Sequence, residues 1–368
     1  MASIAAPSLD LETKRMVEDS LDRFVDESYE PSARRARLMC AEVDYRAFWP
    51  ALAELGVLGL PVSEALGGIG GSVLDVCDAL RVLSRGLVLE PLIESAVIAG
   101  ALLGTGPGAA EATAEAISGD VLAVLVGGRR GDDLRCSQQG AGWQLSGRLR
   151  VVPGAAQADV WLIAGVDDAG EPMVLRAAPR DLSVRVQTYR MMDGRGASDI
   201  EFAATPLPGA ALWLVGAPAR AALADARARA VSAYCADAAG AMQCLVKLTG
   251  EYLRTREQFG VSIGTFQALQ HRYADMHMAA LEARSMAREI SRSVDLADAP
   301  RVEWLRYAAP MVVARCGERV GHEAIQMHGG MGVTDELIVS HYNSRLVVLN
   351  KLLSRWSADA QPVGSALN

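Results

Sequence analysis

The spacing of hydrophobic and polar positions changes twice along the chain. From about residue 8 to 117, apolar residues recur every three or four positions, as in Phe48 to Leu58, which is typical of amphipathic helices. Pro61 is expected to stop that helix, and the glycines from Gly67 to Gly71 form a loop. Ser72 or Asp75 is placed to cap a following helix that runs to about Ser84. The first third is therefore predicted to be helical.

The middle of the chain has the pattern of β-strands. Short apolar or alternating runs follow one another, separated by Gly, Pro and Asp, which indicates an antiparallel sandwich or barrel. The runs cover residues 121–126, 143–152, 159–165, 174–175, 182–186 and 200–203.

The last third returns to a helical pattern. Alanine-rich segments are expected to form helices near 219–256, 266–294 and 301–328, with a shorter one near 336–357. A first helix of 38 residues would be about 57 Å long, and helices of this length usually form a bundle that packs on another subunit. We therefore predict an α+β multidomain fold: an N-terminal helical domain (1–117), a middle antiparallel β-barrel or sandwich (118–216) and a C-terminal four-helix bundle (217–368).

Composition narrows the class of protein. Hydrophobic residues make up 51% of the 368 residues, enough for a large core, and 36 basic against 44 acidic residues give a net charge of −8, which disfavours nucleic-acid binding. We expect no membrane span, because no long uncharged apolar run occurs, and no secretory signal, so the predicted location is the cytoplasm. The six scattered cysteines are expected to be reduced.

Several common sites are excluded by their motifs. Gly68-Ile69-Gly70 lacks the third glycine of a Rossmann fingerprint, and the chain has neither a P-loop nor a G-x-S-x-G elbow. The histidines do not form a helical metal pair, because His271/His277 and His322/His328 are each six residues apart. No metal site is therefore predicted.

Two stretches near helix ends carry candidate chemistry. In the first stretch, which contains Arg256 and Phe259, the arginine is placed to bind a phosphate and the aromatic side chain to cover a ring. Ordinary helix capping with solvated arginines explains the same residues. In the second, glycines let a backbone approach a ligand closely, although a plain helix-to-helix turn needs them too. The stretches are Arg256-Glu257-Gln258-Phe259-Gly260 with Phe266-Gln267, and Gln326-Met327-His328-Gly329-Gly330.

Together these residues resemble the acyl-CoA dehydrogenase family. The resemblance extends to Leu55–Pro61 and Gly67–Ser72 in the helical part, and to Trp143–Gly147 and Val152–Leu162 in the β part. It implies FAD with its adenine and diphosphate held across a subunit interface, an acyl-CoA substrate, and an electron-transfer flavoprotein as acceptor. By resemblance, the cofactor-binding residues are Arg256, Gln258, Phe259, Phe266, Gln267, Gln326, Met327, His328, Gly329 and Gly330.

The chain departs from the family at the catalytic base. The family removes an α-proton with a carboxylate, which is placed either about a helix beyond the glycine motif or about 26 residues before the arginine that matches Arg256. The first position lacks its usual Tyr-Glu-Gly setting, since only Asp335, Glu336 and Asp359 follow Gly330, and the second position is Ala230. The catalytic residue is therefore left unknown.

A second departure concerns the flavin ring. The family's ring-contacting segments correspond to Val126–Asp133 and Arg150–Pro153, whose residues do not match the family pattern. The chain thus keeps the family's residues for the FAD diphosphate but not those for the flavin ring. This combination resembles one subunit of the α2β2 acyl-CoA dehydrogenases of bacterial steroid and side-chain catabolism, in which a second chain supplies the base.

Three other hypotheses stay open. One is a self-sufficient homomeric dehydrogenase with a displaced base, for which Asp237 or Asp335 and Glu336 are the candidates. Another is a non-catalytic scaffold that no longer binds flavin. The last is a flavin-dependent monooxygenase of the same fold.

Overall fold

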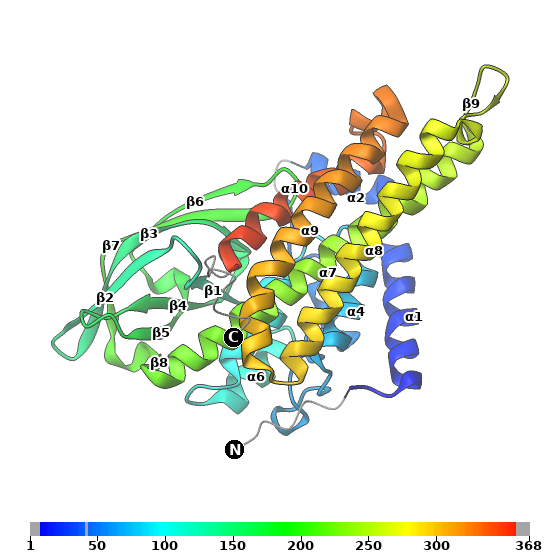
Figure 1. Cartoon of the computed structure of the whole chain (residues 1–368). Helices are drawn as coiled ribbons and strands as arrows, with labels where there is room; N and C mark the ends of the chain where they lie inside the picture. The colour runs from blue at the N-terminus through cyan, green and yellow to red at the C-terminus, as the bar shows by residue number, and fades with distance from the viewer. Residues whose placement is uncertain (1–7, 41–42, 358–368) are drawn as a thin grey trace.

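The computed structural model describes residues 8–40 and 43–357, which form three regions (Figure 1). Helices of the N-terminal part pack on the long helices of the C-terminal part, and the twisted sheet lies at one end of that bundle (Figure 1). One continuous hydrophobic core runs through all three regions, including Leu52, Ile163 and Leu349. The order of helices, sheet and helices agrees with the prediction.

The N-terminal part is helical, and its caps follow the sequence. Ser72 caps α4, and Asp75 completes a capping box with it, so the two predicted cap residues act together. The helix predicted from Phe48 to Leu58 is wrong in length: it ends at Glu54, because the chain turns at Gly56 with φ +74° well before Pro61. The helices are α1 (Leu11–Ser28), α2 (Pro31–Met39), α3 (Trp49–Glu54), α4 (Val73–Leu83), a π-helix (Ile93–Ala99), α5 (Gly100–Leu103) and α6 (Ala109–Ile117).

The middle part is one eight-stranded sheet in the order β6-β7-β3-β2-β4-β5-β8, with β1 paired to β4. The antiparallel prediction needs correction, because β4 pairs in parallel with both β1 and β2, so the sheet is mixed. The strand predicted at 182–186 corresponds to β6, which begins at Arg185, three residues later than predicted. Strands β2 and β8 were not predicted. The strands are β1 (Ala123–Gly127), β2 (Asp133–Gln139), β3 (Gly142–Pro153), β4 (Val160–Val166), β5 (Pro172–Ala177), β6 (Arg185–Arg190), β7 (Gly196–Pro208) and β8 (Leu212–Val215).

The C-terminal part is the predicted four-helix bundle. Its helices are α7 (Ala217–Thr255), α8 (Gln267–Asp295), α9 (Ala299–His328) and α10 (Ile338–Trp356), within about two residues of the predicted ends. The buried face of α7 consists largely of alanines such as Ala230 and Ala238, whose small side chains let α8, α9 and α10 approach closely. Helix α7 is thus the centre of the bundle and also packs on α4.

Two general properties follow from the described residues. None of the described helices is long and apolar enough to cross a membrane. All six cysteines are free thiols, of which Cys40 is exposed and four are buried.

Candidate functional site

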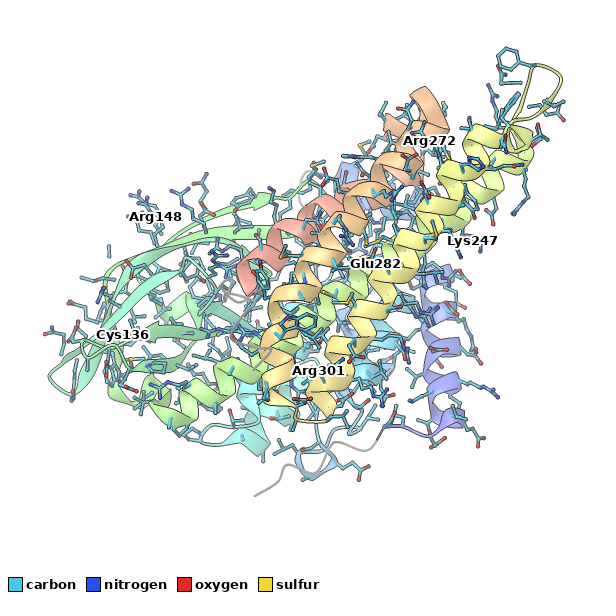
Figure 2. The ribbon with its side chains drawn as sticks, viewed as in Figure 1. Cys136, Arg148, Lys247, Arg272, Glu282 and Arg301 are labelled. Carbon is cyan, nitrogen blue, oxygen red and sulfur yellow. The ribbon has the colours of Figure 1, made fainter. Side chains whose placement is uncertain are left out.

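The two motifs near helix ends meet at one tip of the bundle. Helix α8 runs antiparallel to α7 and α9, so the end of α7 at Thr255, the start of α8 at Gln267 and the end of α9 at His328 lie together (Figure 1). The ring of Tyr252 on α7 stacks on His328 of α9 with centroids 4.4 Å apart. Just below the tip, an ion pair of 2.7 Å between Arg272 and Glu323 joins α8 to α9; Figure 2 shows Arg272 on that part of the bundle. We call this end the bundle tip.

Eight of the ten predicted cofactor-binding residues are exposed at the bundle tip. Arg256 is the C-terminal cap of α7, and neither its guanidinium nor that of Arg254 makes an ion pair with any described residue. An unpaired arginine on the surface is free to meet an anion bidentately. Met327 and His328 differ from the prediction, because both are buried; the His328 Nδ1 lies 2.8 Å from the Ala324 carbonyl oxygen, and burial lowers the pKa of the imidazole.

A tight hairpin projects from the bundle tip. Strands β9 (Glu257–Gln258) and β10 (Val261–Ser262) are joined by Phe259 and Gly260, both with positive φ, as a type I′ turn requires. Phe259 has φ +56°, which is strained for a bulky residue, and its side chain is 91% exposed. The ring of Phe266 lies edge-on to it at 6.2 Å. A strained and exposed aromatic pair is what a contact with another molecule would use.

The glycine turn after α9 has two kinds of glycine. A Cβ added to Gly329 or Gly330 would meet no atom within 4 Å, although Gly329 also needs its φ of +61°. A Cβ on Gly332 would lie only 2.6 Å from the Ile325 carbonyl oxygen, so that glycine is required for packing. The same tip thus carries exposed glycine backbone and an arginine without an ion pair, a combination that leaves room for a phosphate-bearing ligand.

The other candidate half, on the sheet, is tied together by a buried arginine. The Arg129 side chain is 2% exposed and ion-pairs with Asp132 at 3.0 Å. Its Nη1 donates to the Val151 carbonyl oxygen (2.6 Å) and its Nη2 to that of Arg150 (3.0 Å). Asp132 also pairs with Arg355 of α10, whose end lies beside β1 (Figure 1). We call Arg129, Asp132 and Arg355 the Arg129 clamp.

The clamp holds an unusual backbone conformation. Val151 has φ +51°, rare for a β-branched residue, at a register shift between β3 and β7. Its carbonyl oxygen accepts from Arg129, and its N–H donates to the Asp199 carboxylate at 2.9 Å. The Asp199 carboxylate also accepts from the Tyr189 hydroxyl at 2.8 Å. Both segments that correspond to the family's ring contacts are thus hydrogen-bonded to each other through Arg129.

A second buried cluster joins the three regions. Asp193 accepts from Arg195 (2.7 Å) and from Arg345 of α10 (3.1 Å). Burial would raise the pKa of Asp193, but these two arginines hold it below its usual value. Arg195 also lies 3.6 Å from Glu94 on the π-helix, and Glu94 accepts from the Tyr234 hydroxyl at 2.9 Å. The cluster links the helical part, the sheet and the bundle through charges.

The proposed displaced bases are engaged elsewhere or exposed. Asp237 is buried, accepts from the Ser84 hydroxyl at 2.9 Å and lies 3.9 Å from Arg345. It lines a cavity with about 30 Å³ of water-accessible space, which is enough for a water molecule but not for an acyl thioester.

The other carboxylate candidates give no site either. Asp335 is exposed beside Arg35 and His341, Glu336 is also exposed, and Asp359 lies outside the described residues. Ala230 is fully buried on α7. The catalytic base therefore stays unassigned. No three His, Cys, Asp or Glu side chains within 8–40 and 43–357 are grouped as a metal site.

Sequence reasoning missed Arg129, Glu94 and Arg195 as functional-site neighbours. A signal for Glu94 was present, because Glu90 and Glu94 both interrupt an otherwise apolar stretch from Leu87 to Leu103, where a charge must be paired when buried. Arg129 and Arg195 gave no such signal, since their partners come from distant parts of the chain.

Two models of one protein family match the chain. The model of the acyl-CoA dehydrogenase N-terminal domain matches residues 11–111, and that of the C-terminal domain matches residues 219–349. Among curated proteins, the chain is 28% identical over 349 residues to "Acyl-CoA dehydrogenase FadE27" of Mycobacterium tuberculosis, covering 88% of each chain.

Solved structures share the fold. The ChsE4–ChsE5 complex from Mycobacterium tuberculosis superposes with a TM-score of 0.84 at 24% identity, covering 95% of each chain. A variant of the Tcur3481–Tcur3483 steroid ACAD gives 0.84 at 23% identity, covering 97% of this chain and 98% of that one. Glutaryl-CoA dehydrogenase from Mycobacterium smegmatis in complex with FADH2 gives 0.78 at 18% identity, covering 93% and 90%. Both terminal domains are matched in order around the shared fold, and the chain belongs to the acyl-CoA dehydrogenase family.

Proposed function

We propose that this chain is a subunit of an FAD-dependent acyl-CoA dehydrogenase and lends its bundle tip to the FAD of a catalytic partner chain. The enzyme would form a 2,3-enoyl-CoA from an acyl-CoA, with an electron-transfer flavoprotein as acceptor. The observation that carries the proposal is the contrast between two half-sites. The bundle tip presents unpaired Arg256 and open glycine backbone, whereas the Arg129 clamp bonds the sheet's segments to each other.

Each tip residue has a specific expected role. Arg256 would neutralise and orient the diphosphate, Phe259 and Phe266 would cover an aromatic ring, and Gly329 and Gly330 would let backbone approach the ligand. Gln258, Gln267 and Gln326 would supply amide hydrogen bonds from the same exposed surface. FAD, when bound, accepts the β-hydrogen of the acyl-CoA as a hydride. The buried Met327 and His328 would support the turn from inside.

The comparisons support this proposal through the related proteins, while the cofactor and the partner of this chain are part of the proposal itself. One structural neighbour is described as a complex of two chains, ChsE4 and ChsE5, another as a steroid ACAD, and a third as a complex with FADH2. A steroid-like acyl-CoA is thus the substrate class that we propose for the assembly. The homomeric alternative is less favoured, because Asp237 faces only a water-sized cavity beside Arg345.

The test uses the chain assembled with an acyl-CoA dehydrogenase chain encoded beside it. Arg256→Ala should weaken FAD retention about 10- to 150-fold, the range for losing a charge-assisted hydrogen bond. Flavin absorbance after gel filtration measures retention. Arg284→Ala is the matched control, because Arg284 is exposed on α8 away from the tip and has no ion pair within the described chain. Equal FAD occupancy in both variants would contradict the proposal.

A further inference from the structure

The outward face of the sheet carries a groove that the flavin proposal does not use. Residues of β3, β7 and β6 line it, and its water-accessible volume is about 250 Å³. Figure 2 shows Arg148 on this face, pointing away from the bundle. The lining side chains come from alternate positions of each strand, which places them on one side of the sheet. They are Arg148, Arg150, Arg185, Gln187, Asp199 and Glu201, and Ile200 also borders the groove.

Two rows of side chains cross the groove. Strand register aligns Arg148 and Arg185 on either side of Glu201, with ion-pair distances of 2.9 and 3.8 Å. The second row aligns Gln187 with Asp199, and Arg150 lies on the far side, next to the Val151 N–H that bonds Asp199. The hydrogen bond and charge of Arg148 lower the pKa of Glu201, so both carboxyls are ionised at neutral pH.

The charges of the groove do not cancel. Three arginines face two carboxylates, and one Asp199 oxygen is already committed to the Val151 N–H and the Tyr189 hydroxyl. The Arg150 guanidinium makes no hydrogen bond or ion pair with a described side chain. This local excess of positive charge stands in a chain whose net charge is −8. The free donors of Arg150 and Arg185 therefore favour an oxyanion.

The groove is also held in shape. Arg129 fixes the carbonyl oxygen of Arg150 at 3.0 Å, and Asp199 fixes the next residue's N–H. A preformed site loses less conformational entropy on binding than a mobile one.

We propose that this groove binds a nucleoside phosphate. The arginines would take the phosphate, while Glu201, Asp199 and Gln187 would accept hydrogens from the ribose hydroxyls and the base amine, groups that inorganic phosphate lacks. The volume of about 250 Å³ is of nucleotide size rather than phosphate size. Two sources share this chemistry: a free nucleotide, and the nucleotide end of a CoA thioester. Binding of a CoA thioester in the groove rests on the proposed function, whereas binding of a free nucleotide there does not.

The experiment titrates the full chain, alone and with its partner, with ADP, CoA and inorganic phosphate by calorimetry. Arg150→Ala and Arg185→Ala should each weaken nucleotide binding about 10-fold or more. Arg180→Ala is the control, because Arg180 is 88% exposed in the same region and outside the groove. Circular dichroism checks that each variant is folded.

Each outcome of the titration supports or overturns the groove proposal. CoA binding at least 10-fold tighter than ADP assigns the CoA source, and equal binding assigns free nucleotides. Phosphate binding as tightly as ADP, no binding at all, or an equal loss in Arg180→Ala would overturn the groove proposal. None of these results alters the flavin test with Arg256→Ala, so the two proposals fail separately.

Discussion

Breaking the Arg129 clamp should cost far more stability than breaking an exposed pair of similar geometry. Arg129→Met removes the buried guanidinium but keeps apolar volume, and it leaves the carbonyl oxygens of Arg150 and Val151 without their donors. Removing one partner of a buried pair costs about 3–5 kcal/mol. Asp132 keeps Arg355 as its partner, so we expect the lower end, about 3 kcal/mol.

Urea unfolding followed by tryptophan fluorescence and circular dichroism measures this loss. Arg148→Met is the matched control, because Arg148 pairs with Glu201 at 2.9 Å while its side chain is 55% exposed. An exposed pair contributes about 0–1 kcal/mol. Unfolding midpoints that fall equally in the two variants, at unchanged m-value, would refute the reasoning from burial. Opening the clamp should also not give the isolated chain a bound flavin, since no ring-contacting residues are restored.

Three further outcomes follow from the structure. Gly330→Ala should leave the melting temperature of the free chain unchanged but weaken FAD retention in the assembly. Gly332→Ala should lower the melting temperature in either state, because its Cβ would lie 2.6 Å from a carbonyl oxygen. If Gly330→Ala lowers only the stability and not the FAD retention, cofactor contact at Gly330 is contradicted. Burial raises the pKa of the Glu90 carboxyl to about 7, above the 4.5 of an unfolded glutamate, although Arg37 lies 3.0 Å from it. The folded chain therefore binds a proton that the unfolded chain has lost, and its stability should fall, by at most about 3 kcal/mol, as the pH rises from 4.5 to 7. Urea unfolding of the Glu90→Gln variant should lack this slope, and an unchanged slope would assign it to another group. Arg254→Ala should weaken FAD retention less than Arg256→Ala if the cap residue is the one that faces the diphosphate, which gel filtration with flavin absorbance compares directly.

The elements that depend on local signals were predictable. Long alanine-rich runs of helical period set the four bundle helices, and Ser72 with Asp75 set the start of α4. Strand β2 was not predicted because its alternation is short: only Leu134 and Cys136 of its seven residues are buried, and its last three residues are polar. Strand β8 has only four residues. The parallel pairing of β1 with β4 cannot be read from period two, because alternation does not encode strand direction.

The candidate site likewise has a part that local sequence motifs indicate and a part that they do not. Arg256 and the glycine turn lie within short motifs, so sequence alone could single them out as candidates. The Arg129 clamp joins residues 22 and 223 positions apart, and no local pattern records such a contact. The burial of His328 depends on its stacking with Tyr252 of another helix. Tertiary contacts therefore decide which candidate residues are exposed and which are buried.

We propose above that this chain completes a partner's flavin site and does not catalyse alone. Turnover measures it directly: the chain is purified alone and co-expressed with an acyl-CoA dehydrogenase chain encoded beside it, and each sample is assayed with a ferrocenium acceptor over a panel of acyl-CoA thioesters. Loss of a positioned base lowers the rate by about 10²–10⁴-fold. We expect the isolated chain to show at most that residual rate and the co-purified assembly to be active. Robust turnover by the isolated chain would contradict the account and return the search for a base to Asp237 and Glu336.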